Sequence, residues 1–290
     1  MTGLQILATG PLATVQDLGR PGHAHLGVPR SGAADRGALR LANRLVGNFE
    51  GTAGIEVTLG GLRLRTDGRA LVAVTGAVGA VMVNGRPVGT GARTELPAGG
   101  ELSIGTPVTG CRSYLAVRGG IDVPAVLGSR STDVLAGLGP PPLAAGDVLA
   151  VGPPQAALPA VAMAPVDAHR DRITVVTLFD GPRREHLADP ASLTAGMWEV
   201  GADSNRVGVR LARPGGTAQS PANHRPDAGE LASEGIAHGS VQVPPTGNPV
   251  IFLADHPVTG GYPVAGVLSA HSLDAVAQLV AGSLIRFRTG

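Results

Sequence analysis

Short apolar runs separated by Gly, Pro or Asn form the main pattern along this chain. Their length and their β-branched content favour strands over helices. Asn84-Gly85 directly follows one of these runs and predicts a tight hairpin turn. The chain is therefore expected to be mostly β. The clearest strand candidates are residues 55–59, 70–74, 81–83, 114–117, 173–178 and 250–253.

Two segments have the spacing of a helix. Residues 33–45 place their leucines near one face, with Ser31 or Asp35 as the N-cap and a Gly-Asn stop at 47–48. Residues 273–280 are a second, shorter candidate, with Ser272 as the expected cap. A few helices are thus predicted beside many strands.

One small pattern occurs three times: an apolar anchor, a glycine three residues later, and apolar residues at positions six and eight. It starts at Leu96, Leu143 and Leu279. The pattern predicts a glycine turn that leads into an alternating strand. It hints at internal duplication, although such turns are common in β proteins.

The organisation of the chain points to two β-rich halves. Residues 153–171 are rich in Pro and Ala and are predicted to link a domain over 1–152 to a domain over 172–290. Regular strand–helix alternation is missing, so barrels or sandwiches with helical covers are expected in place of a doubly wound parallel sheet.

Composition narrows the possible functions. The 290 residues are 43% hydrophobic, 16% charged and only 2% aromatic, with a net charge of +1. No basic patch is evident, so nucleic acid is not expected as a partner. The single cysteine, Cys111, excludes an internal disulfide and is interpreted as an inert core thiol. Neither a signal peptide nor a membrane span is evident, so a cytoplasmic location is expected.

All 23 basic residues are arginines, and lysine is absent. A P-loop, a Schiff-base enzyme and a biotin carrier each need a lysine. None of these can therefore reside in this chain.

Polar residues that interrupt glycine-rich turns are the first candidates for chemistry. Gln16, Asp17 and Arg20 can form a hydrogen-bonding cluster for a carboxylate or an amide, or else a structural Asp–Arg pair that fixes a loop. The turns at 118–120 and 128–132 suit an anion, and a plain turn cluster explains them equally well.

A further candidate site spans residues 234–263. Gln242, Asp255 and Tyr262 fall at predicted strand ends, where they can bind a small polar substrate; alternatively, the Tyr262 hydroxyl only completes a turn. His23 and His25 have no acidic or Cys partner at a familiar metal spacing, so no metal site is predicted.

These loops resemble the allophanate hydrolase subunit 2 family, also described as biotin-dependent carboxyltransferase-like, which includes 5-oxoprolinase subunits. The resemblance runs through nearly the whole chain, in the expected order. It rests on residues 14–22, 27–35, 41–48, 75–77, 114–121, 127–132, 206–211, 233–234, 241–244, 255, 259–263, 277–279 and 286–287.

The resemblance implies two cyclophilin-like β-barrel domains and one subunit of a larger amide-processing enzyme. The favoured activity is ATP-dependent hydrolysis of 5-oxo-L-proline to L-glutamate, with partner subunits of the A and B types. One alternative is the carboxyltransferase part of a urea carboxylase or allophanate hydrolase system, with biotin supplied in trans. Another is a non-catalytic regulatory binding subunit. No covalently bound cofactor is expected, and ATP need not contact this chain.

Site roles carried over from the resemblance fall mainly in the C-terminal half. Catalytic roles are expected for Asp255, Tyr262 and Glu234, with Glu234 as the base. His256 and Pro257 depart from the family pattern next to this site. Substrate-binding roles are expected for Gln242, Gly260, Gly261, Arg206, Arg210, Gln16 and Arg20.

Overall fold

The computed structural model describes residues 2–166, 173–215, 224–225 and 229–290. The chain divides into two compact units. The first contains residues 1–20 and 31–169, and the second contains residues 21–30 and 170–290. The predicted linker, 153–171, ends outside the described residues, because 167–172 are not among them.

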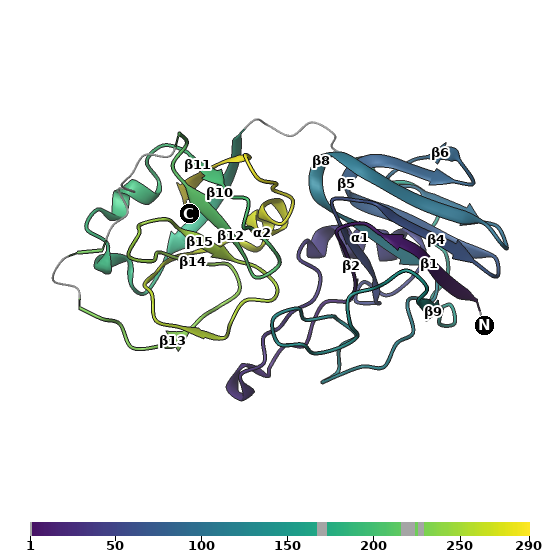
Figure 1. Ribbon diagram of the computed structural model, residues 1–290, viewed down its shortest axis with the longest axis horizontal. Helices are drawn as coiled ribbons and strands as arrows, with labels where there is room; N and C mark the ends of the chain where they lie inside the picture. Colours follow the sequence, from purple (N-terminus) through teal and green to yellow (C-terminus); the bar gives the residue numbers. More distant parts are fainter. Residues whose placement is uncertain (1, 167–172, 216–223, 226–228) are drawn as a thin grey trace. The chain divides into compact units, whose positions relative to one another are not determined.

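The first unit is built on a nine-stranded sheet (Figure 1). Strands β2-β3-β8-β4-β1-β9 follow one another in that order, and β5 pairs with β6, β7 and β8. The strands are β1 (Gly3–Thr9), β2 (Leu12–Gln16), β3 (Gly54–Thr58), β4 (Leu62–Thr66), β5 (Ala70–Val83), β6 (Arg86–Val88), β7 (Arg93–Leu96), β8 (Glu101–Val117) and β9 (Val148–Ala150).

The two longest strands, β5 and β8, pair antiparallel along most of their length. Their register shifts three times between Gly76 and Val81, and Gly76 and Gly110 have positive φ values of 88° and 86°. Such irregularities bend a strand and re-aim its ends. The first part of β8 pairs with β4 and its last part pairs with β3, so this one strand joins both ends of the sheet.

Helix α1 (Arg36–Leu45) begins at Asp35, whose side chain accepts a 2.8 Å hydrogen bond from the Ala38 amide. This N-cap satisfies an amide that the helix itself leaves open. The helix buries Leu39, Ala42 and Leu45. It packs on β5 and β8. The predicted helix is confirmed, but it starts at Arg36 and not at residue 33, and Asp35 is its cap in place of Ser31.

The second unit is a closed barrel of seven strands in the order β10-β17-β14-β15-β12-β11-β18. Strands β10 and β18 are parallel, and the other neighbouring pairs are antiparallel. The strands are β10 (Ile173–Asp180), β11 (Trp198–Val200), β12 (Gly208–Ala212), β14 (Ser240–Gln242), β15 (Val250–Phe252), β17 (Val264–Leu268) and β18 (Leu284–Thr289).

Smaller elements complete the second unit. Strands β13 and β16 form a separate two-stranded ribbon. Helix α2 contacts β10. The bounds are β13 (Glu234–Gly235), β16 (Thr259–Gly260), α2 (Ala270–Val276), η1 (Ala24–Leu26), η2 (Arg184–His186) and η3 (Pro190–Leu193).

The mostly-β class and the two β units agree with the prediction. The turn at Asn84-Gly85 joins β5 to β6, and both residues have positive φ, as a tight hairpin requires. The threefold pattern is a real turn: Gly99, Gly146 and Gly282 all have positive φ, and each leads into a strand. At each site, the amide after the glycine donates to the carbonyl three residues earlier.

The second helix begins earlier than predicted. It covers Ala270–Val276 and is capped by Ser269, whose hydroxyl accepts from the Ser272 amide at 3.2 Å. The predicted cap, Ser272, lies inside the first turn. Its hydroxyl accepts a 2.9 Å hydrogen bond from the Thr177 amide of β10, so a long-range contact determines its role.

Each unit has its own hydrophobic core. The core of the second unit contains the only tryptophan, Trp198, which is fully buried and donates to the Leu193 carbonyl at 2.9 Å. The Arg213 guanidinium lies 3.8 Å from its ring centroid, and burial lowers the pKa of Arg213. Trp198 fluorescence should therefore report on the second unit alone.

We expect the substitution Ile251→Ala to lower the unfolding free energy of the second unit by about 2–5 kcal/mol, because it empties a fully buried site. The measurement is urea denaturation followed by Trp198 fluorescence. Ile55→Ala makes the same change in the core of the first unit and should leave this transition in place. Equal shifts from both substitutions would show that the two cores do not unfold separately.

Candidate functional site

A buried ion pair joins two strand ends in the second unit. Arg206 lies just before β12, and Asp255 lies just after β15. The Nε of Arg206 is 2.8 Å from one Asp255 oxygen, and its Nη2 is 2.9 Å from the other. Both side chains are almost fully buried, at 1% and 0% exposure. Two parallel hydrogen bonds make this pair strong and geometrically specific.

The main chain reinforces this ion pair, because the Asp255 amide donates to the Arg206 carbonyl at 3.1 Å. The resemblance implied a catalytic role for Asp255 and a substrate-binding role for Arg206, and the structure pairs the two side chains with each other. Each charge is directed at the other, so the pair serves first to hold β12 and β15 in position.

Gln242 and the turn before β17 form the next part of the site. Gln242 ends β14 and donates through Nε2 to the Tyr262 carbonyl at 2.8 Å. Tyr262 is 47% exposed, so its side chain is accessible to a ligand. The glutamine, by contrast, is only 5% exposed. It therefore fixes the backbone that presents the tyrosine.

Of the two predicted glycines, only Gly260 is needed for neighbouring side chains to pack closely against the turn. A Cβ on Gly260 would lie 2.6 Å from Ile236 Cδ1 and 3.0 Å from the Gln242 amide nitrogen. A Cβ on Gly261 would be 3.5 Å from the nearest atom, which is an ordinary contact. Gly260 thus allows Gln242 to approach the turn.

Glu234 pairs through its backbone with Gly260 in the β13–β16 ribbon. Its carboxylate accepts from Nε of Arg183 at 3.0 and 3.1 Å, and from Nη2 of the same residue. This hydrogen bonding lowers the pKa of Glu234 and raises that of Arg183. Glu234 is therefore ionised at neutral pH, and its carboxylate is bound to a cation, which makes it a weak proton acceptor.

Sequence reasoning missed Arg183. The residue lies three positions after the end of β10, and its amide donates to the Val264 carbonyl of β17 at 3.1 Å. A Gly-Pro turn followed by arginine was the available signal. The partner, Glu234, is 51 residues away in the chain, so only the fold reveals the pair.

Arg210 does not join the buried pair. It lies on β12 opposite Val250 of β15, and its side chain is exposed. His256, next to Asp255, is buried and stacks on His238, with ring centroids 6.1 Å apart and an interplanar angle of 18°. Its Nδ1 lies 2.8 Å from the Pro257 carbonyl oxygen. The position that departs from the family pattern is thus part of the packed wall beside Asp255.

Gln16 and Arg20 belong to the first unit. Gln16 is fully buried and donates to the Thr132 carbonyl at 2.9 Å and to the Thr14 hydroxyl at 3.0 Å. Arg20 donates to the carbonyls of Ser131 and Val126. Both side chains are therefore used to bind neighbouring backbone.

Asp17 connects its own loop to the glycine-rich turn at 128–132. Its carboxylate accepts from the hydroxyls of Ser129 and Ser131 and from the Arg130 amide. Arg20 instead has Asp133 as its ion partner, at 3.8 Å. An Asp17–Arg20 pair is not formed within the described part of the chain, yet the loop-fixing interpretation fits this closed network.

Glu56 of β3 is a buried acid that contacts the segment leading into α1. Glu56 accepts from the Tyr114 hydroxyl at 2.8 Å and from the Ala34 amide at 3.0 Å, and the same hydroxyl accepts from the Asp35 amide. Burial and the Glu56 charge raise the pKa of Tyr114 well above its ordinary value. Tyr114 is therefore a fixed hydrogen-bond donor to Glu56.

Burial raises the pKa of the Cys111 thiol, which is buried and stays protonated, in agreement with an inert core residue. Within the described ranges, no group of three His, Cys, Asp or Glu residues is placed to hold a metal ion. No helix in the same ranges is long and apolar enough to cross a membrane.

With this geometry established, comparison with known proteins defines the class. Residues 26–289 match the family described as "Carboxyltransferase domain, subdomain A and B", and the chain belongs to this family. It is similar to the C-type subunit of 5-oxoprolinase from Escherichia coli (strain K12), at 37% identity over 98% of this chain and 90% of that protein.

Longer proteins contain a similar region. Urea amidolyase of Lachancea kluyveri is 35% identical over 98% of this chain, which corresponds to 17% of that protein. The crystal structure of TTHA0988 superimposes on this chain with a TM-score of 0.87 at 32% identity. The match covers 99% of this chain and 55% of the TTHA0988 chain. This chain therefore corresponds to 17% of the urea amidolyase and to 55% of the TTHA0988 chain.

We expect Asp255→Ala to lower the unfolding free energy by about 3–5 kcal/mol, because it leaves the buried Arg206 guanidinium without this carboxylate. The double substitution Arg206→Met/Asp255→Leu removes both charges and should cost much less. Urea denaturation followed by Trp198 fluorescence measures both. The coupling would be contradicted if the double variant lost as much unfolding free energy as the single substitutions Arg206→Met and Asp255→Leu lose together.

Glu234 should titrate below its ordinary pKa, and Arg183→Gln should raise that pKa towards the ordinary value. Because the folded-state pKa is lowered, the pair stabilises the fold above the unfolded-state pKa and loses this effect as pH falls through the folded-state value. Carboxyl-carbon NMR of the side chain gives the titration directly. Arg210→Gln is the control, and an equal shift from it would refute the specific pairing.

Proposed function

We propose that this chain is the C-type subunit of a 5-oxoprolinase, the enzyme that hydrolyses 5-oxo-L-proline to L-glutamate with ATP. The observation that carries the proposal is the extent of the match. The C-type subunits of two 5-oxoprolinases, at 37% and 36% identity, are covered over 90% of their own length. The urea amidolyases are covered over only 17% and 16% of theirs.

The chemistry divides naturally between subunits. Opening the lactam requires ATP to activate its oxygen, and this chain lacks the lysine of a P-loop. We therefore assign nucleotide activation to partner subunits of the A and B types. This chain contributes amide recognition and stabilisation of the negative charge that develops during ring opening.

Among the proposed catalytic residues, Tyr262 has the most available functional group. Asp255 is bound to Arg206, and Glu234 is bound to Arg183. We assign Tyr262 as the hydrogen-bond donor to the substrate and Gln242 as the residue that positions it. Asp255 and Arg206 hold the strand ends on which both depend, and Glu234 orients the β13–β16 ribbon.

The second candidate is carboxyl transfer to urea. It is supported by urea amidolyase relatives and by a Kluyveromyces lactis urea carboxylase structure with a TM-score of 0.85. Without lysine, this chain would need carboxybiotin delivered on another polypeptide. Each reaction acts on a small amide, 5-oxo-L-proline in one case and urea in the other. The same residues would therefore serve either reaction.

The test is to co-express the chain with A-type and B-type partners from the same genome and to measure ATP-dependent glutamate release from 5-oxo-L-proline. Activity should require all three polypeptides. Tyr262→Phe should lower kcat by about 10²–10³-fold, the cost of removing one donor to a developing oxyanion. Gln242→Met should also lower kcat, because it removes the hydrogen bond to the Tyr262 carbonyl. Gln5→Met, an exposed change in the first unit, is its control.

Three outcomes separate the candidates. Glutamate release that needs this chain supports the proposal. If biotin-dependent carboxylation of urea is observed and glutamate release is not, the carboxyltransferase candidate is supported. If the partners alone release glutamate at the full rate, the proposal is rejected. A regulatory role for this chain is then favoured.

A further inference from the structure

A cavity of about 840 Å³ opens at one end of the sheet in the first unit. It lies where Thr2 precedes β1, where β5 begins and where β7 and β8 end. Its volume is in the range of small-molecule sites. It shares no residue with the set around Tyr262, so it is independent of the proposed function.

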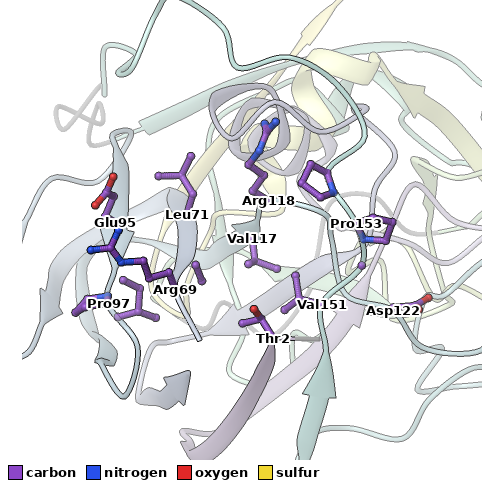
Figure 2. Close-up of a pocket in the computed structure, with 14 residues that line it drawn as sticks. Thr2, Arg69, Leu71, Glu95, Pro97, Val117, Arg118, Asp122, Val151 and Pro153 are labelled. Atoms are coloured by element: carbon purple, nitrogen blue, oxygen red, sulfur yellow. The ribbon is translucent and has the colours of Figure 1, made fainter. Parts of the chain in front are cut away.

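The wall of this cavity is largely apolar. Leu71, Val117 and Val151 lie along it, and Pro153 closes one side (Figure 2). A ligand with one or two aliphatic side chains can bury them here, at roughly 25 cal/mol per Å² of apolar area.

Four charged residues line the cavity, and two of them are already engaged. Asp122 pairs with Arg130 at 3.0 Å. Arg118 donates to the Val46 carbonyl at 2.9 Å and to the Ala156 carbonyl at 2.7 Å. Their main contribution is to hold the rim of the cavity in place.

The other two charged residues, Arg69 and Glu95, are exposed, and their side chains form no hydrogen bond or ion pair with the residues that the structure describes. They lie on neighbouring strands: Arg69 immediately precedes β5, and Glu95 of β7 is opposite Leu71 of β5. Figure 2 shows both at the same side of the cavity. One available cation and one available anion thus stand beside an apolar wall.

We propose that this cavity binds a small zwitterion of dipeptide size with apolar side chains. The ligand carboxylate binds the Arg69 guanidinium, its ammonium group binds Glu95, and its side chains pack on Leu71, Val117 and Val151. Arginine suits a carboxylate because its planar fork can donate two parallel hydrogen bonds. Since exposed ion pairs contribute little alone, apolar burial supplies most of the affinity and the charges select the ligand.

The test is isothermal titration of the full chain with three probes: Leu-Leu, N-acetyl-Leu-Leu and Leu-Leu amide. The two capped peptides each lack one terminal charge. Leu-Leu should bind saturably, and each capped peptide should bind about tenfold more weakly, a difference of about 1.4 kcal/mol.

Variants then assign each charge to its terminus. Arg69→Gln should weaken Leu-Leu to the level of the amide and leave the amide unaffected. Glu95→Gln should weaken Leu-Leu to the level of N-acetyl-Leu-Leu and leave binding of the acetylated peptide unaffected. Leu71→Trp fills the cavity and should abolish binding, while Arg86→Gln, an exposed change on β6 outside the cavity, should have no effect.

Arg69 and Glu95 are exposed, so their variants should keep the fold, which circular dichroism checks. Absence of saturable Leu-Leu binding to the native chain would overturn the proposal. Equal affinity for all three peptides, or binding that persists unchanged in both charge variants, would also overturn it.

Discussion

The bidentate ion pair between Arg206 and Asp255 is the interaction on which the second unit depends. It ties the start of β12 to the end of β15 inside the protein. A buried pair of this kind is costly to break because the remaining charge has no water to solvate it. The loop after Asp255 must then pass His256 and reach the turn at 259–263, which Gln242 fixes from β14. The exposed Tyr262 is the outward end of this series of contacts.

The first unit also depends on buried carboxylates, but these accept hydrogen bonds from hydroxyls and backbone amides. Glu56 receives the Tyr114 hydroxyl and the Ala34 amide, and it thereby fixes the entry to α1. Asp17 receives two serine hydroxyls and a backbone amide, and it thereby closes the turns around 128–132. In the first unit, then, buried carboxylates organise glycine-rich turns that have little apolar surface of their own, and in the second unit the buried amide of Gln242 does so. The high glycine content is compatible with an ordered fold for this reason.

Local signals in the sequence were sufficient for part of this structure. The turn at Asn84-Gly85, the three glycine turns and the Asp35 cap each depend on a few adjacent residues, and each was predictable. The start of α2 was not, because Ser272 bonds to β10 across 95 residues. The candidate site shows the same limit. Gln242, Asp255 and Tyr262 were identified as polar residues at strand ends, but the pairing of Asp255 with Arg206 and of Glu234 with Arg183 depends on barrel closure.

The absence of lysine determines what the candidate site can do. Every cation is an arginine, which stays charged over the working pH range and cannot act as a base. Arg206 and Arg183 each hold a carboxylate through more than one hydrogen bond, and Arg183 lowers the pKa of Glu234, which makes that carboxylate a weak proton acceptor. Proton transfer at this site would therefore fall to groups outside these pairs. In the proposed 5-oxoprolinase, the exposed Tyr262 side chain would donate a hydrogen bond to the developing oxyanion, and the proposed partner subunits would supply the base along with the nucleotide.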